Sequence, residues 1–216
     1  MSLTLCEVHR LLDGDGQTWQ WQRRHPLTAW APSIGAPPAG AALSLLLGAS
    51  WTSLVCAPWV EGIARQRDWQ QYARLMLAER LGGEPEDWHV GWQLPQPRQA
   101  LLVAGVRQTQ WQALLAAIRA EGLRLHQALP LFPWLLSQVR PSGDGHATWL
   151  LAEAGTLQWA TWRLGGWQAG GQIALAAGTS RSGMLAMLQA LELSCGRIHW
   201  VSADAEAARP FCWSVI

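Results

Sequence analysis

The chain has 216 residues, of which 50% are hydrophobic and 14% charged, and its formal net charge is +1. This composition excludes a disordered or polyelectrolyte chain and supplies enough apolar surface for a sizeable core. All 16 basic residues are arginine, which excludes a P-loop, a Schiff-base enzyme and a polybasic membrane anchor. Without a basic excess, nucleic acid is not expected as a partner.

Residues 1–140 predict a first α/β half that opens with a hairpin. A strand over Leu3–Leu12, an Asp/Gly-rich turn and an alternating strand over Thr18–Gln22 follow one another. Two stretches with apolar residues at helical spacing predict helices over Glu61–Arg80 and Gln108–Ala120. Further strands are predicted at Leu43–Leu47, Trp51–Cys56, Trp88–Gln93, Ala100–Val106 and Leu123–Leu129, with a short helix from Pro130 through Val139.

Residues 146–216 predict a second, smaller half, joined to the first by the linker 141–145. The expected order is three strands, a helix capped by Ser180, and two more strands: Ala147–Glu153, Thr156–Leu164, Gln168–Ala176, Ser180–Leu193, Arg197–Ser202 and Phe211–Ile216. Strands that alternate with helices predict an α/β protein of mixed sheets with crossover helices, in two related halves.

The apolar window Ala39–Ala57 is long enough to cross a bilayer, but Gly48 and its neighbours split it into two runs of strand length. We therefore predict two buried strands there rather than a membrane helix. The N-terminus lacks the apolar segment of a secretory signal. The cysteines form no CxxC pair and have no histidine at ligand spacing, which favours a reduced, cytoplasmic chain without a metal site: Cys6, Cys56, Cys195 and Cys212.

Several phrases between residues 40 and 180 carry a family resemblance. They are the Leu54–Trp59 step (LVCAPW), a long helix with Tyr72-Ala73 in its middle and Gly82 after it, the strands Trp88–Val90 and Leu101–Val106 (LLVAGV), and Glu121–Leu125 leading to Pro130. In these phrases and in element order the chain resembles the actin-like cytoplasmic proteins of type IV pilus and type II secretion assembly: PilM, MshI and the cytoplasmic module of the secretion L protein.

The resemblance implies a ribonuclease-H-like, actin-type fold that acts as a scaffold. Family members hold the cytoplasmic tail of an inner-membrane protein and connect it to the assembly ATPase machinery. We therefore expect a non-catalytic adaptor, cytoplasmic and peripheral to the inner membrane through that partner, with no direct membrane insertion. Because the sequence ends at Ile216 without a membrane helix, it resembles the soluble PilM arrangement more than the secretion L protein.

An active actin-like ATPase, with ATP and Mg²⁺, is the first alternative. Actin-type ATPases hold phosphates between two hairpin loops, and the first would be formed here by Asp13, Gly14, Asp15, Gly16 and Thr18. At the second loop, Glu153 stands where an aspartate is expected. Metal and water positioning tolerates little displacement, so a degenerate fold without nucleotide, and hence without a cofactor, is favoured.

The 16 tryptophans, against one tyrosine and two phenylalanines, give the second alternative, a tryptophan-lined carbohydrate-binding module. About two thirds of the indoles are expected to replace phenylalanine and tyrosine in the core. We place the partner-binding groove near Trp159, Trp162 and Trp167. Trp159 and Trp162 are three residues apart and cannot point to the same side of a regular strand, so one of them is expected to be exposed or at an interface.

Overall fold

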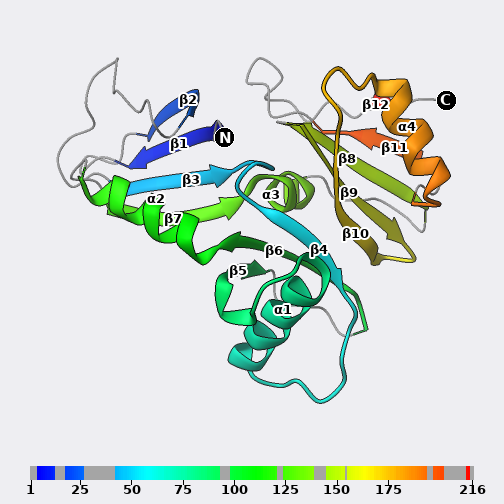
Figure 1. The fold of residues 1–216 in the computed structure, drawn as a ribbon, viewed down its shortest axis with the longest axis horizontal. Coiled ribbons are helices and arrows are strands. Elements are labelled where there is room, and N and C mark those ends of the chain that lie inside the picture. The colour runs from blue at the N-terminus through cyan, green and yellow to red at the C-terminus, as the bar shows by residue number, and fades with distance from the viewer. Residues whose placement is uncertain are drawn as a thin grey trace.

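In the described part of the chain, four β-sheets and four α-helices form a mixed α/β structure (Figure 1). The structure is a computed structural model, and it describes residues 4–12, 18–26, 42–92, 98–120, 124–138, 145–153, 155–193, 197–201 and 213–214. For residues 4–12, 18–26, 42–44, 46, 92, 138 and 213–214 it describes the backbone alone.

The N-terminal strands form the predicted hairpin. β1 (Thr4–Leu12) pairs antiparallel with β2 (Thr18–Pro26), which extends beyond the predicted end at Gln22. Beside them, β3 (Ala42–Leu47) pairs in parallel with β7 (Arg124–Pro130). The crossover helix α2 (Gln108–Ala120) precedes β7 and buries Leu114 and Ile118 against Leu45 and Leu47. The apolar spacing that predicted α2 is therefore the spacing of its core contacts.

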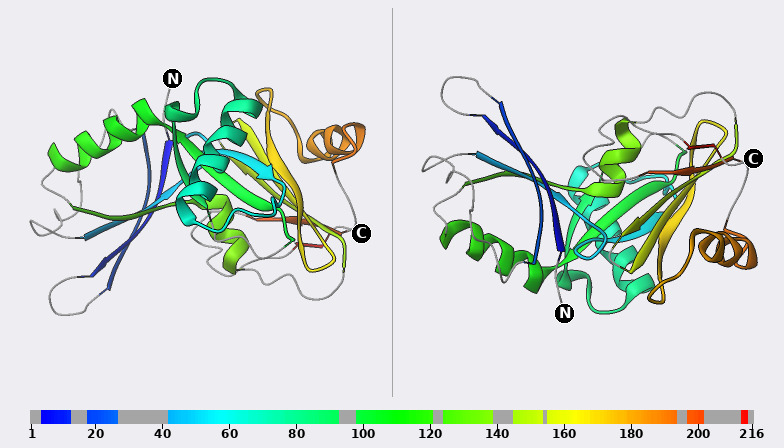
Figure 2. Two further views of the ribbon diagram at one scale, coloured as in Figure 1. Left: turned by 90° about the horizontal axis from the view of Figure 1, so that it is seen from below. Right: turned by 90° about the horizontal axis from the view of Figure 1, so that it is seen from above.

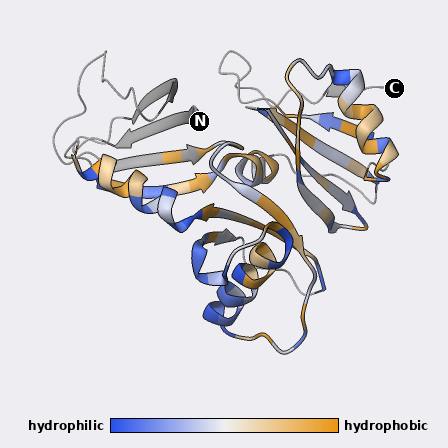
Figure 3. Cartoon of the chain, in the orientation of Figure 1, coloured by the Kyte–Doolittle hydropathy of each residue, from blue (hydrophilic) through white to orange (hydrophobic). Residues whose placement is uncertain are grey.

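A three-stranded antiparallel sheet has the order β4 (Ser53–Ala57), β6 (Leu101–Arg107) and β5 (Trp88–Trp92). Helix α1 (Gln66–Leu81), which carries both hydrophilic and hydrophobic residues, covers one face of this sheet (Figure 3). There Trp69 and Leu77 pack with Trp88 and Val90. A 3-10 helix over Pro85–Asp87 leads into β5.

The predicted start of α1 at Glu61 is wrong, because side chains of the helix hold the segment before it in an irregular conformation. The Trp69 indole N–H donates to the carbonyl of Ile63 (3.1 Å), and the Tyr72 hydroxyl donates to that of Pro58 (3.0 Å).

The C-terminal part forms one five-stranded sheet. β8 (Ala147–Glu153), β9 (Thr156–Arg163) and β10 (Gly166–Ala174) make an antiparallel meander, as the glycine turns predicted. Helix α4 (Arg181–Ala190) then crosses over to β11 (Arg197–Trp200), which pairs in parallel with β8 and antiparallel with β12 (Trp213–Ser214). Ser180 caps α4 as predicted, since its Oγ accepts from the Gly183 N–H (3.2 Å). The helix ends earlier than Leu193 because Glu192 adopts φ 54°.

The two sheet systems pack together along a seam between β4 and β10. A Cβ at Gly170 would lie 2.8 Å from Leu102 Cδ2, so the two strands approach closely at this glycine. Gln172 accepts from the Leu54 backbone N–H (3.2 Å) and donates to Ser53 Oγ (3.3 Å). Gln158 donates to the Thr52 carbonyl (3.1 Å). The seam is thus apolar at its centre and hydrogen-bonded to the edge of β4.

The fold confirms the prediction of mixed sheets with crossover helices. β3 and β4 occupy the apolar window as strands, and no helix in the described ranges is long and apolar enough to cross a membrane. The third α-helix, α3 (Leu131–Gln138), follows β7 as predicted (Figure 2). It buries Leu131, Phe132 and Leu136 in the cluster shared by the β4–β6–β5 sheet and the five-stranded sheet. The relation between the two halves and the domain division at 141–145 stay predictions.

Candidate functional site

The first of the two predicted phosphate loops lies mostly outside the described residues. Asp13, Gly14, Asp15 and Gly16 lie outside the described residues, and Thr18 begins β2 with its backbone opposite Leu12. Whether these residues bind nucleotide stays a prediction.

At the second loop, the Glu153 carboxylate has a structural partner. Its Oε2 accepts a hydrogen bond from the backbone N–H of Ala49 (3.0 Å). A Cβ at Gly48 would lie 2.6 Å from the same oxygen, so the carboxylate rests directly on the turn between β3 and β4. This contact ties the two parts of the chain together.

Side chains fill the space between the β4–β6–β5 sheet and the five-stranded sheet. Leu54, Leu102 and Ala104 from one sheet meet Trp149 and Leu151 from the other in a single buried cluster. Dense apolar packing of this kind leaves no room for a polar ligand between those strands.

The three tryptophans of the predicted groove are divided between two faces. Trp159 is 7% exposed and packs with Leu188 of α4. Trp162 lies on the opposite face, where its ring meets that of Trp167 edge-on at 4.9 Å. The two indoles of β9 thus point to opposite sides as expected, but Trp162 is half-buried rather than exposed because the first part of the chain covers its face. A role of the three in partner binding stays a prediction.

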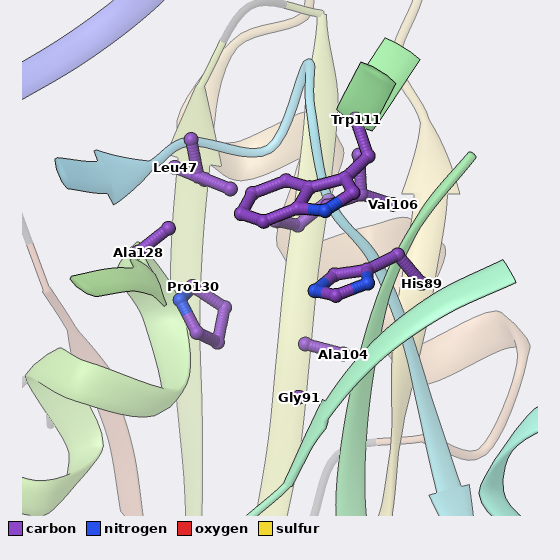
Figure 4. A pocket seen from close by; sticks show the side chains of 9 residues that line it. Leu47, His89, Gly91, Ala104, Val106, Trp111, Ala128 and Pro130 are labelled. Atoms are coloured by element: carbon purple, nitrogen blue, oxygen red, sulfur yellow. The ribbon is translucent and has the colours of Figure 1, made fainter. Parts of the chain in front are cut away.

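A small pocket lies on the face of the β4–β6–β5 sheet that α1 leaves uncovered (Figure 4). Along β5, Trp88 and Val90 point towards α1, so His89 and Gly91 point away from it. Further walls come from β6, from the ends of β3 and β7, from Thr52 and from α2: Ala104, Val106, Leu47, Ala128, Pro130 and Trp111. The cavity measures about 40 Å³, which suits one short apolar group or a few waters and is far too small for a nucleotide.

The polar feature of this pocket is a stacked pair of rings. The imidazole of His89 lies parallel to the indole of Trp111, with ring centroids 4.2 Å apart and an interplanar angle of 8°. Burial lowers the pKa of His89 below its ordinary value, and the charge of Arg74 lowers it further. The imidazole is therefore neutral at pH 7, and the pocket presents an uncharged, largely apolar wall.

Two further observations bear on what the pocket can bind. β5 is the end strand of its sheet and, in the described structure, pairs only with β6. A Cβ at Gly91 would meet no atom within 4 Å, so the pocket is open above this residue. An open pocket beside an end strand is the arrangement that accepts an extended peptide, whose backbone pairs with the strand and whose side chain enters the pocket.

The described residues offer little for catalysis. They contain no group of three or more side chains that could hold a metal ion. The thiol of Cys56 is half-buried, and desolvation raises its pKa to about 11, so it stays protonated and unreactive at neutral pH. Of the eleven tryptophans with described side chains, none is exposed, so none of these eleven offers the flat exposed indole that a carbohydrate-binding module uses.

Sequence reasoning missed His89, Gly91 and Trp111. The six histidines are scattered along the chain, and nothing in the pattern distinguishes His89 from the others. Its position directly after a core tryptophan on a predicted strand places it on the opposite face of that strand. The helix that lies over that face could not be inferred.

Comparison with solved structures gives three similar chains. The cytoplasmic domain of EpsL, an inner membrane component of the type II secretion system of Vibrio cholerae, is similar over 74% of this chain at 20% identity and a TM-score of 0.44. A protein of unknown function with an actin-like ATPase fold from Bacteroides thetaiotaomicron is similar over 76% at 10% identity and a TM-score of 0.46. The PilM-PilN type IV pilus biogenesis complex contains a chain similar over 90% at 15% identity and a TM-score of 0.49.

This chain spans 62%, 61% and 67% of the length of those three. No family model and no curated protein matches it. The similar structures include the pilus and secretion class that the sequence resembles, together with an actin-like fold. Likeness at this level bears on neither activity nor partners, which are argued below from the residues of this chain.

Proposed function

We propose that this chain is a non-catalytic adaptor of type IV pilus or type II secretion assembly, which binds the cytoplasmic tail of an inner-membrane subunit. It acts in the cytoplasm and is held at the inner membrane through that subunit. The observation that carries the proposal is the open, uncharged pocket of His89, Gly91 and Trp111 beside the end strand β5. The sequence resemblance of residues 40–180 supplies the class of partner.

The tail binds as an extended segment along β5. Because the cavity holds only one short side chain, the remaining affinity comes from backbone hydrogen bonds to the end strand. The neutral imidazole accepts an apolar side chain without the cost of burying a charge. We place the tail at β5 rather than in the groove predicted near Trp159–Trp167, because the indoles there pack against other parts of the chain.

A glycine substitution tests the site without disturbing the fold. Gly91 does not adopt a positive φ, and a Cβ there meets open space, so Gly91→Val fills the pocket mouth without strain. Gly145→Val is the matched control, because Gly145 is also exposed, open and free of positive φ. Each variant and the wild type serve as bait for detergent-solubilised membranes of the source organism, and the captured proteins are quantified by mass spectrometry.

Wild type and Gly145→Val are expected to capture a small inner-membrane subunit of a pilus or secretion system. Gly91→Val should capture it about tenfold less, which corresponds to the loss of one buried aliphatic side chain. Equal capture by all three baits, or capture of no membrane subunit by folded wild type, would contradict the proposal.

The ATPase alternative is tested separately by thermal unfolding with Mg-ATP. A ligand at 100 times its dissociation constant adds about 2.7 kcal/mol, which raises the Tm of a chain of this size by about 5–10 °C. We expect no shift. A rise of that size would mean that nucleotide binds, either at the loop containing Asp13, Asp15 and Thr18 or at another site. The ATPase alternative would then be favoured.

A further inference from the structure

The turn between β9 and β10 carries an exposed leucine in a conformation that leucine disfavours. Leu164 has φ 52° and Gly165 φ 77°, so both central residues of this two-residue hairpin turn are left-handed. Such turns favour Asn, Asp and Gly at both positions, because a branched side chain clashes with its own backbone there. Leu164 is nonetheless 72% exposed, the highest value among the exposed large apolar residues of the described chain. It therefore contributes strain without contributing to the core.

The base of this turn is held rigidly. The Gln99 side-chain amide donates to the Gly165 carbonyl (2.9 Å), and a Cβ at Gly166 would lie 2.9 Å from Gln99 Cδ. Beneath the turn, Trp162 and Trp167 pack edge to face at 4.9 Å, and Trp167 continues into the buried cluster between the sheets. Leu164 is thus an exposed side chain above a packed aromatic pair. The turn that carries it joins β9 to β10 at one end of the five-stranded sheet (Figures 1 and 2).

The surroundings of the turn are basic. Arg98 precedes Gln99, and Arg163 precedes Leu164. Arg197 begins β11 at the same end of the sheet, because it pairs with Ala147 of β8, which in turn pairs with Trp162 of β9. All three arginines are exposed. The segments 88–120 and 154–191, which include the turn and the loop that holds it, contain no aspartate or glutamate.

We propose that this hairpin tip, residues 162–167, is a contact with the surface of an anionic membrane. Leu164 enters the interfacial region, and the half-buried pair Trp162 and Trp167 supports the turn from within the fold. The arginines pair with lipid phosphates. An exposed leucine on an aromatic base within a basic rim matches the chemistry of an anionic bilayer interface better than that of an apolar protein groove, which the three charges would oppose.

The proposed contact is separate from the His89 pocket and does not depend on it. The sequence predicts no direct membrane insertion, and this proposal departs from that prediction. One apolar side chain and three charges give weak, reversible binding, which orients the chain at the membrane surface.

The test is flotation of the full chain with lipid vesicles at low salt. Vesicles of phosphatidylcholine alone are compared with vesicles in which one third of the lipid is phosphatidylglycerol. Leu164→Asn removes the apolar contact and supplies a residue that accepts left-handed φ, so its Tm should stay equal or rise. Leu191→Asn is the matched control, since Leu191 is 52% exposed at the end of α4.

Wild type and Leu191→Asn are expected to float with the anionic vesicles, and Leu164→Asn about tenfold less. Arg98→Gln and Arg163→Gln should each weaken flotation about fivefold on anionic vesicles and leave binding to neutral ones unchanged. Wild type that does not float with anionic vesicles, or Leu164→Asn that floats as well as wild type, would overturn the proposal. Loss of a protein partner in detergent through Leu164→Asn, with no flotation of wild type, would identify a protein-docking surface instead.

Discussion

His89 is the residue through which pH acts on the candidate site. It stacks on Trp111 in the pocket wall, and burial followed by the charge of Arg74 lowers its pKa. The folded protein therefore resists protonating this imidazole, while the unfolded chain protonates it as the pH falls through the ordinary value of 6.5. The unfolded state then binds more protons, and the stability of the fold decreases.

We expect the free energy of unfolding to fall between about pH 7.5 and pH 5.5, and His89→Phe to reduce this fall. Phenylalanine keeps the flat ring against Trp111 but cannot titrate. His199 behaves similarly, since burial and then Arg197 lower its pKa, so part of the dependence should persist in the variant. Urea unfolding at the two pH values measures the effect, and an unchanged pH dependence in His89→Phe would show that His89 is not involved. Tail binding should weaken only at lower pH, where the pH falls through the lowered pKa of the folded His89, because a protonated imidazole disfavours an apolar occupant.

At the level of elements, the seam between β4 and β10 depends on glutamine side chains that replace a missing strand partner. Gln172 accepts from the Leu54 N–H and donates to Ser53 Oγ at the edge of β4. Leu54 is 1% exposed, so removal of the amide leaves a buried backbone N–H without its acceptor. The cost of such a loss is about 1–3 kcal/mol.

We therefore predict that Gln172→Ala lowers the free energy of unfolding by about 1–3 kcal/mol. Gln168→Ala, on the same strand, serves as control, because Gln168 is exposed and donates only to the nearby Arg163 carbonyl. Its effect should stay within about 0.5 kcal/mol. Urea denaturation curves compare the two, and equal stabilities would mean that the seam is held by apolar packing alone.

For the molecule as a whole, the order of elements could be predicted from the sequence because each element has a local pattern. The glycines at 165 and 166 predicted the turn between β9 and β10, which the structure places at Leu164 and Gly165. The spacing of Trp69, Ala73 and Met76 matches the buried face of α1. Boundaries set by tertiary contacts were not predictable. The start of α1 is an example, since it depends on hydrogen bonds from Trp69 and Tyr72 to the preceding loop.

The candidate site itself could not be predicted, because its walls come from five elements and a loop that are distant in the sequence. His89 and Trp111 lie on a strand and a helix separated by β6, and no local pattern places one ring on the other. Trp162 illustrates the same limit: the strand alternation assigned it to the face opposite Trp159, but only the packing of the two sheet systems shows that this face is also covered.

The adaptor proposal is tested most directly by site-specific photo-crosslinking in membranes of the source organism. A benzophenone amino acid replaces Gly91 at the pocket mouth in one variant and Gly145 in the control, and the crosslinked peptides are sequenced by mass spectrometry. We predict that position 91, and not position 145, crosslinks to the terminal cytoplasmic segment of an inner-membrane pilus or secretion subunit. Crosslinks from position 91 only to soluble proteins, or the same products from both positions, would contradict the assignment of this pocket as the tail-binding site.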